Sequence, residues 1–81
     1  MSFNTKLVQY RKRSGINQKE LALRIGLHYK HYNDIERGVA SLPRLDTIVR
    51  IIEELNLTTD EARDLLIEKG VPAYLFDDPS K

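Results

Sequence analysis

Three side chains of this sequence, His28, His31 and Asp34, have the types and the spacing that could hold a metal ion. On one helix they would stand at positions i, i+3 and i+6, and imidazole and carboxylate groups are common zinc ligands. A structural zinc site needs a fourth protein ligand, and the sequence offers none beside these three and no cysteine at all. We therefore expect no metal here, and residues 28–34 are better explained as part of a binding face.

Other catalytic chemistry has little support from the residues present. The acidic residues between positions 53 and 68 fall on segments that need a solvated face, so they do not indicate a catalytic carboxylate pair. No cysteine supplies a thiol nucleophile, and no glycine-rich loop is present that could hold a phosphate. With 81 residues, one domain with a small core leaves little chain to build a cleft. We expect neither an enzyme activity nor a cofactor.

The sequence also gives no sign of a membrane or a secretory route. No apolar run approaches the ~20 residues of a membrane span, and the first residues, Met-Ser-Phe-Asn-Thr-Lys, include no apolar signal segment. A cytoplasmic protein without membrane contact is the expectation.

Charge is distributed unevenly along the chain. Residues 1–45 carry nine lysines and arginines against three acidic residues, whereas residues 46–81 carry four against nine. The formal net charge of +1 hides this asymmetry. A basic half beside an acidic half is typical of a protein with one face for a polyanion.

The spacing of the apolar residues predicts five short helices and no central strand, which is a compact all-α fold. Asn17 with Glu20, and Thr58 with Glu61, have the spacing of helix N-terminal capping patterns. Gly70 stands where the last helix should stop. The first helix includes Phe3, Leu7 and Tyr10 and is expected to end at Ser14-Gly15, and the next two are expected at Gln18–Ile25 and about His28–Arg37. The fourth runs over 45–55, and the last begins after Thr58. The core-facing stripe of the fourth helix is expected to consist of Leu45, Ile48, Ile51, Ile52 and Leu55.

The second and third of these helices follow each other through a tight turn, which is the helix-turn-helix pattern. Gly26 permits a sharp turn that a residue with a Cβ would resist, and the small Ala22 lets the two helices cross closely. The crossing should be fixed from inside by Ile25, Tyr32 and Ile35. The exposed face of the later helix could then enter the DNA major groove, which is ~12 Å wide.

This region resembles the helix-turn-helix of phage repressors, of Cro and of the small bacterial regulators like them. The matching segments are 16–22, 25–27 and 35–38, followed by Pro43 and the helix expected at 45–55. The resemblance covers about residues 7–67. It implies a five-helix repressor-like domain that binds double-stranded DNA and regulates transcription.

The resemblance also implies which residues contact the bases: Tyr29, Lys30, His31, Asn33 and Asp34. Lys30 can donate to guanine O6 and N7, and Tyr29 can offer its hydroxyl to a phosphate or a base. Asp34 departs from the family pattern, because a carboxylate repels the DNA phosphates. It could accept from cytosine N4, or it could pair with Lys30 one turn earlier.

Further residues are implied as contacts to the DNA backbone: Gln18, Lys12, Arg13, Arg37 and Arg44. In the family, the glutamine that Gln18 matches binds a phosphate and props a recognition side chain. Lys12, Arg13 and Arg37 are equally explained as ordinary charges at helix ends. Arg11 and Glu36 match a structural ion pair that ties the first helix to the end of the recognition helix.

The expected function is sequence-specific regulation of transcription, as a repressor that binds a two-fold operator as a homodimer. The alternative is a protein-binding module, such as the antitoxin or anti-repressor partner of another protein. Retention on DNA that falls steeply with salt would separate the two.

The chain is expected to divide into a DNA-binding domain at residues 1–70 and a C-terminal extension at residues 71–81. Apolar residues near the end exceed what the last helix needs for docking, and they are the expected dimer contact: Leu65, Leu66, Tyr74, Leu75 and Phe76. Because Pro72 cannot continue a helix, residues 73–76 are expected to be extended. They would lie across a second subunit, or back over Phe3 and Leu7 of the same chain.

Overall fold

The computed structural model describes residues 2–72 and Leu75. In that part of the chain the regular structure is helical throughout, so the predicted all-α fold is confirmed. The observed bounds of the second and third helices agree with the prediction to within one residue. The helices are α1 (Phe3–Arg13), α2 (Gln18–Arg24), α3 (Tyr29–Arg37), α4 (Leu45–Glu54) and α5 (Thr59–Lys69).

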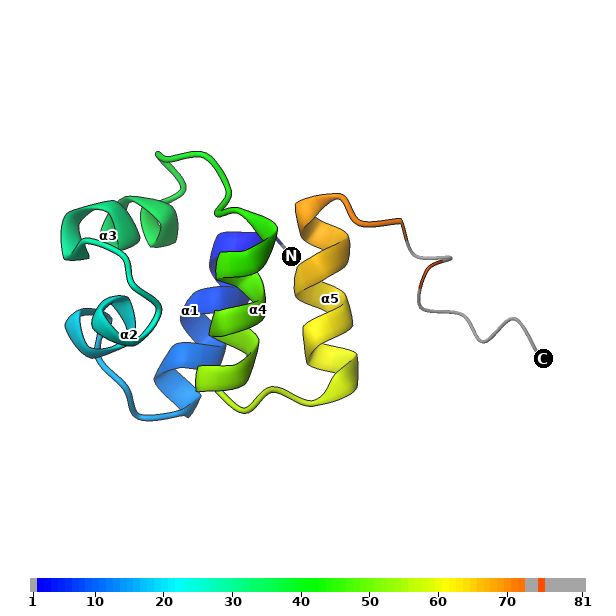
Figure 1. The fold of residues 1–81 in the computed structure, drawn as a ribbon, viewed down its shortest axis with the longest axis horizontal. Helices are drawn as coiled ribbons and strands as arrows, with labels where there is room; N and C mark the ends of the chain where they lie inside the picture. Colours follow the sequence, from blue (N-terminus) through cyan, green and yellow to red (C-terminus); the bar gives the residue numbers. More distant parts are fainter. Residues whose placement is uncertain (1, 73–74, 76–81) are drawn as a thin grey trace.

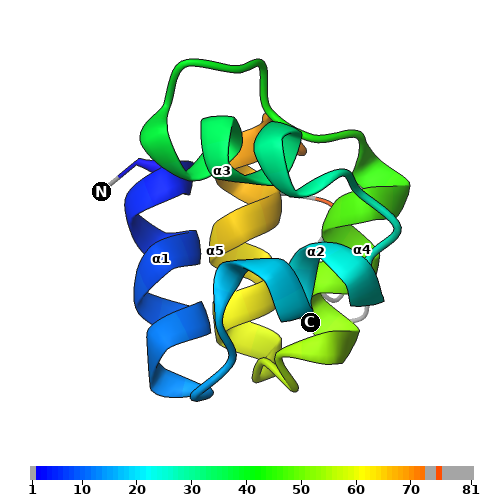
Figure 2. The same ribbon diagram turned by 90° about the vertical axis from the view of Figure 1, so that its left-hand side faces the viewer.

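The helices form two groups. In Figure 1, α1, α4 and α5 run side by side, and α2 and α3 lie together at one end of the molecule. Figure 2 looks onto that end, with α5 behind and between α1 and α4. α3 packs against α2 and α1, and α2 also contacts α4. The three longer helices therefore form a support from which α2 and α3 project to solvent.

The turn between α2 and α3 follows the expected design. Gly26 has a φ of +75°, in the left-handed region that a residue with a Cβ rarely adopts. The N–H of Leu27 donates to the carbonyl oxygen of Ala22 at 2.9 Å, and Ala22 is buried. These features let α3 leave α2 after a very short connection.

The core draws on all five helices. The sequence prediction placed Leu45 on the core-facing stripe of α4, but its side chain is 50% exposed. At 3.6 residues per turn, Leu45 points roughly 90° away from the mean direction of the buried residues of α4. Ile52 is only half-buried for a similar reason. The buried apolar residues are Phe3, Leu7, Leu21, Ala22, Ile25, Tyr32, Ile35, Ile48, Ile51, Leu55 and Leu65.

The C-terminal end corrects one expectation. Leu65 is fully buried beneath α5, so it cannot contact a second subunit, because its side chain is used in the docking of its own helix. The N–H of Leu75 donates to the carbonyl oxygen of Pro72 at 3.1 Å, and Leu75 is the one residue of the segment expected to be extended, 73–76, that the structure describes. Leu75 is 61% exposed and does not cover the core. The expectations for Tyr74 and Phe76 lie outside the described residues.

Candidate nucleic-acid interface

The outer face of α3 presents the side chains that were predicted to read bases. The helix begins at its N-cap His28, whose Nδ1 accepts from the N–H of Lys30 at 3.3 Å. It ends at Gly38, which has a φ of +76°. Its inner face is buried. The outer face carries Tyr29, Lys30 and His31, which are exposed, and Asn33 and Asp34, which are half-buried.

Gln18, the first residue of α2, holds two of these side chains in place. Its Oε1 accepts from Asn33 Nδ2 at 3.0 Å and from the Tyr29 hydroxyl at 3.4 Å. Its Nε2 donates to Glu36 Oε1 at 2.8 Å. The amide thus joins the reading face of α3 to the buried carboxylate beneath it, and the orientation of Asn33 and Tyr29 depends on Gln18.

A buried ion pair anchors this arrangement from below. Arg11 donates from Nε to Glu36 Oε2 at 2.6 Å and from Nη2 to Glu36 Oε1 at 3.2 Å. Its Nη1 donates to the carbonyl oxygen of Ile16 at 2.9 Å, and the Tyr32 hydroxyl donates to Glu36 Oε2. Arg11 and Glu36 are only 9% and 8% exposed. α1, α2 and α3 therefore meet at one satisfied carboxylate.

The protonation of Glu36 follows from these contacts. Burial alone would raise the pKa of its carboxyl group, but hydrogen bonds from Arg11, Tyr32 and Gln18 outweigh burial and hold that pKa below its ordinary value. The hydrogen bond to Glu36 raises the pKa of Arg11. Burial, followed by the hydrogen bond to Glu36, raises the pKa of Tyr32. The pair is therefore charged at neutral pH, with Tyr32 as a neutral donor.

Asp34 does not form the ion pair with Lys30 that was one of its two expected roles. Its carboxylate Oδ1 instead lies 3.4 Å from Nη1 of Arg37, three residues further along α3. The guanidinium of Arg37 reaches back over one turn of the helix, which leaves Lys30 without an acidic partner among the described residues. Lys30 is consequently free to point away from the protein, whereas the charge of Arg37 is partly offset.

The other basic residues that were predicted to contact the DNA backbone do not gather at one site. Arg13 pairs with Glu61 at the start of α5, through both oxygens of that carboxylate, so it is directed away from α3. Arg44, the N-cap residue of α4, pairs with Asp46 at 3.0 Å. Lys12 is exposed at the end of α1. The structure thus gathers Gln18 with the α3 side chains, but not Arg13.

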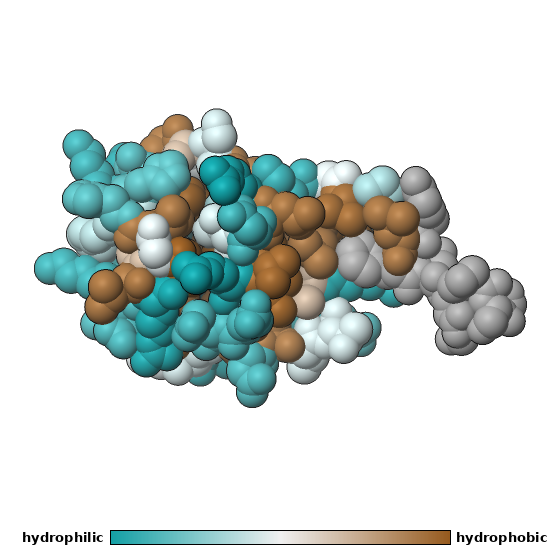
Figure 3. Space-filling model, viewed as in Figure 1, coloured by the Kyte–Doolittle hydropathy of each residue, from teal (hydrophilic) through white to brown (hydrophobic). Residues whose placement is uncertain are grey.

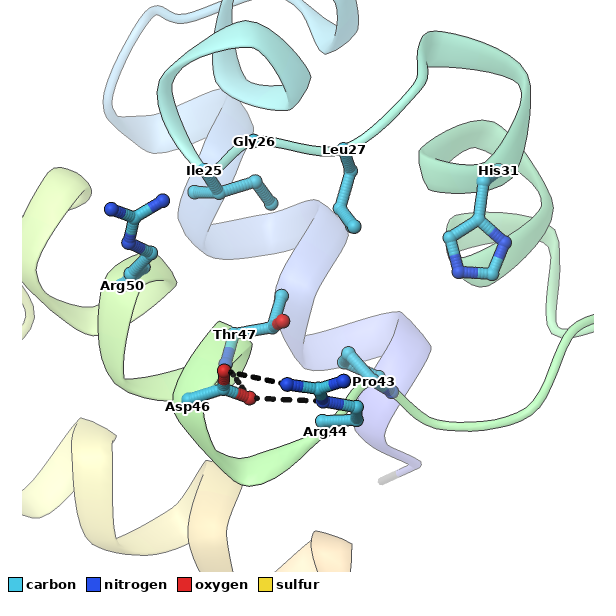
Figure 4. Close-up of a pocket in the computed structure, with 9 residues that line it drawn as sticks. All are labelled: Ile25, Gly26, Leu27, His31, Pro43, Arg44, Asp46, Thr47 and Arg50. Carbon is cyan, nitrogen blue, oxygen red and sulfur yellow. Dashed lines mark hydrogen bonds and ion pairs between the residues drawn. The ribbon is translucent and has the colours of Figure 1, made fainter.

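Two cations beside α3 were missed in the sequence analysis. Lys19 Nζ lies 5.5 Å from the centre of the Tyr29 ring, which is a cation–π distance. Arg50 lines a pocket between the α2–α3 turn and α4, together with His31 of α3 (Figure 4). Arg50 follows Asp46 by four residues and Thr47 by three, and that helical spacing places all three on the polar face of α4. This spacing was the feature of the sequence from which Arg50 could have been placed beside Asp46 and Thr47.

The described residues contain no group of three histidine, aspartate or glutamate side chains arranged to hold a metal ion. His28 is instead the N-cap of α3. Among the helices of the described segments, none has the length and apolarity that crossing a membrane requires.

Comparison with known proteins agrees with this geometry. The profile of the helix-turn-helix family matches residues 7–61, which run from the second turn of α1 to the first turn of α5. No curated protein and no solved structure matches the chain. The predicted family is confirmed by the profile match. The chain belongs to the helix-turn-helix family of the Cro and phage-repressor type, and it is a DNA-binding regulator of transcription.

Proposed function

We propose that this regulator is a repressor that binds a two-fold DNA operator as a homodimer and reads each half-site with α3. The observation that carries the proposal is the outer face of α3, where exposed polar side chains are oriented by Gln18 from the neighbouring helix. A reading face held by such contacts loses less side-chain freedom when it binds. α2 and α3 also project from one end of the molecule, where a DNA duplex can approach them (Figure 2).

Three side chains are the proposed principal readers. Lys30, which has no acidic partner among the described residues, donates to guanine O6 and N7. Tyr29 is 41% exposed and offers its ring to a thymine methyl group while Gln18 holds its hydroxyl. Asn33 uses the Oδ1 that its bond to Gln18 leaves available. His31 and Asp34 flank these readers, and Asp34 accepts from cytosine N4.

The proposed backbone contacts surround this face. The side chain of Gln18 is occupied within the protein, so we expect its phosphate contact to come from the backbone N–H groups at the start of α2. Lys12, Arg37 and Arg44 are exposed and can each neutralise a phosphate. Arg13, which pairs with Glu61, is the weakest of the proposed contacts.

The dimer surface is proposed on the outer face of α4 and the adjoining end of α5. Leu45 and Val49 are 50% and 44% exposed on α4. Beside them, Val71 and Leu75 line an apolar groove with Leu45. Figure 3 shows apolar surface gathered over this part of the molecule. A second copy would bury that surface, and Leu66, which is half-buried in α5, would lie at its margin.

Selection from a random pool of DNA duplexes tests the proposal directly. We expect a motif with two-fold symmetry and half-sites about 34 Å apart, on one face of the duplex. Sedimentation of the full chain at micromolar concentration should show a dimer. A selected motif of a single half-site, from a monomeric protein, would contradict the dimeric operator. Placing the selected motif over a promoter should lower expression of a reporter gene, and increased expression would contradict the repressor assignment.

The groove that Leu45 and Leu75 line also favours a second candidate, a regulator held by another protein. An antitoxin or an anti-repressor partner would use this surface for the other protein and not for a second copy. The same sedimentation experiment separates these candidates. A chain that stays monomeric, and that binds DNA without a steep dependence on salt, would favour the protein-binding role.

A further inference from the structure

A pocket lies between the α2–α3 turn and the first turns of α4, and it adjoins the outer face of α3 at His31 (Figure 4). Its volume is about 490 Å³, within the ~300–1,000 Å³ that is usual for small-molecule sites. Ile25, Leu27 and Pro43 give it an apolar lining. His31 reaches it from α3, so the pocket touches both the recognition helix and the supporting helix.

Several hydrogen-bond donors around this pocket have no partner among residues 2–72 and Leu75. The guanidinium of Arg50, the hydroxyl of Thr47 and the imidazole of His31 border the same opening in Figure 4. In the described part of the chain none of these groups forms a side-chain hydrogen bond. Arg50 also has no ion-pair partner there. The pocket therefore presents three groups able to donate that have no partner among the described residues, and its one carboxylate, that of Asp46, is already paired with Arg44.

The remaining charges of the pocket largely cancel. Arg44 Nη2 lies 3.0 Å from Asp46 Oδ2, and Arg44 Nε lies 3.3 Å from Asp46 Oδ1. Since this arginine and this aspartate neutralise each other, the uncompensated charge is the positive charge of Arg50. The chemistry of the pocket is that of an anion site.

The absence of a side chain at Gly26 lets the guanidinium of Arg50 lie close to the turn. A Cβ at Gly26 would lie 3.3 Å from Arg50 Nη1, which means that the guanidinium packs directly against the turn between α2 and α3. An anion bound by Arg50 would thus lie beside that turn. Thr47 lies further along the pocket from Arg50, and His31 lies at the opposite end, beyond Leu27 (Figure 4).

We propose that this pocket binds a phosphate group, with Arg50 as the principal donor and Thr47 as an additional donor, while His31 lines the opposite end of the pocket. The planar fork of a guanidinium donates two parallel hydrogen bonds to phosphate oxygens. The phosphate could belong to the DNA backbone or to a free phosphorylated small molecule, whose remaining part would occupy the apolar portion of the pocket. A phosphate from the DNA backbone would depend on the proposed DNA-binding function, whereas a free phosphorylated molecule would not.

The first experiment uses no DNA. Inorganic phosphate is titrated into the ¹⁵N-labelled full chain at constant ionic strength, and the amide signals of Gly26, His31 and Thr47 are followed. For a free ligand we expect saturable shifts, and Arg50→Gln should weaken binding about tenfold, as for loss of a charged hydrogen bond. Arg63→Gln is the matched control, because Arg63 is exposed on α5 outside the pocket.

The second experiment measures duplex DNA binding as a function of salt. If the phosphate comes from the DNA backbone, Arg50→Gln should reduce the salt slope by about one, and Arg63→Gln should leave it unchanged. Saturable phosphate binding with an unchanged slope assigns the site to a free ligand. A reduced slope without phosphate binding assigns it to DNA. Phosphate shifts that Arg50→Gln leaves unaltered, or no effect of the variant in either experiment, would overturn the proposal.

The variant is suited to both measurements. Arg50 is exposed and has no partner in the described part of the chain, so its replacement should leave the fold intact, as circular dichroism can verify. Arg50→Lys adds a second check on the geometry. It keeps the charge but loses the planar fork, and it should bind phosphate with an affinity between those of the wild type and Arg50→Gln.

Discussion

At the level of single residues, replacing a proposed base contact and replacing a proposed contact to the DNA phosphates should change DNA binding in different ways. Lys30→Ala is expected to lower specific binding by roughly 1–3 kcal/mol and to relax preference at one base pair per half-site. Lys12→Ala, at a proposed phosphate contact, should weaken binding to all sequences about equally. Selection from a random duplex pool with each variant shows the change in preference, and titration of each variant with a specific and an unrelated duplex measures the two affinities. An unchanged motif for Lys30→Ala would show that this lysine is not a reader.

The buried ion pair gives a second comparison, on stability. Glu36→Ala would remove the carboxylate that accepts two hydrogen bonds from the buried Arg11, and breaking a buried pair in this way costs about 3 kcal/mol. Glu53 is exposed, and Glu53→Ala should cost less than ~0.5 kcal/mol. Urea unfolding of both variants gives the free energies. Equal losses would mean that the pair contributes nothing specific to stability.

The same carboxylate makes the stability depend on pH. Because its hydrogen bonds hold the pKa of Glu36 below the ordinary value, its charged form stabilises the fold above the unfolded pKa of ~4.3. That contribution disappears as pH falls through the lower pKa of the folded state. The free energy of unfolding of the wild type, minus that of Glu36→Gln, should be constant above about pH 5 and shrink below about pH 4. A difference that stays constant into strong acid would contradict this account.

At the level of the helices, the sequence was most informative where one residue determines a local conformation. Asn17 accepts from the N–H of Glu20 at 2.8 Å, and Thr58 and Glu61 form a reciprocal capping box. Gly70 has a φ of +111° where the last helix stops. Such caps act within one turn of helix, so local spacing is enough to predict them.

Features that depend on the packing of several helices were harder to predict. Leu65 was expected on a dimer surface and Leu45 in the core, and the structure reverses the two. Apolar spacing marks a stripe along a helix, but the angle at which neighbouring helices cross decides which edge of the stripe is covered. The partner of Asp34 was uncertain for a related reason, since Lys30 and Arg37 both lie one turn away from it.

The turn between α2 and α3 can be tested against a matched glycine. Gly26 and Gly15 both have a φ of +75°, so alanine at either position should cost roughly 1–2 kcal/mol. At Gly26 the added Cβ meets only the tip of Arg50, whereas nothing lies near Gly15. Because that tip can move, the two losses should agree within ~0.5 kcal/mol in urea unfolding. A much larger loss for Gly26→Ala would show that Arg50 is held rigidly against the turn.

At the level of the whole molecule, the polar and the apolar surfaces lie in different places. α2 and α3 form one end (Figure 1), and the exposed apolar residues of α4 lie beside the end of α5 (Figure 3). A single domain makes few phosphate contacts, so two linked copies gain affinity through the high effective concentration of the second reading helix. The separation of the surfaces allows one copy to contact DNA and another copy at the same time.

This division predicts that dimerisation can be removed without unfolding the domain. Val49 is 44% exposed on α4, so Val49→Glu should fold normally but place a charge in the proposed interface. Leu23→Glu, at a side chain on α2 that is 75% exposed, is the control. Sedimentation at micromolar concentration should show a monomer for Val49→Glu and a dimer for Leu23→Glu. Affinity of Val49→Glu for the full two-fold site should fall about a hundredfold, toward that of one half-site. A dimeric Val49→Glu with unchanged operator affinity would exclude the outer face of α4 as the contact between copies.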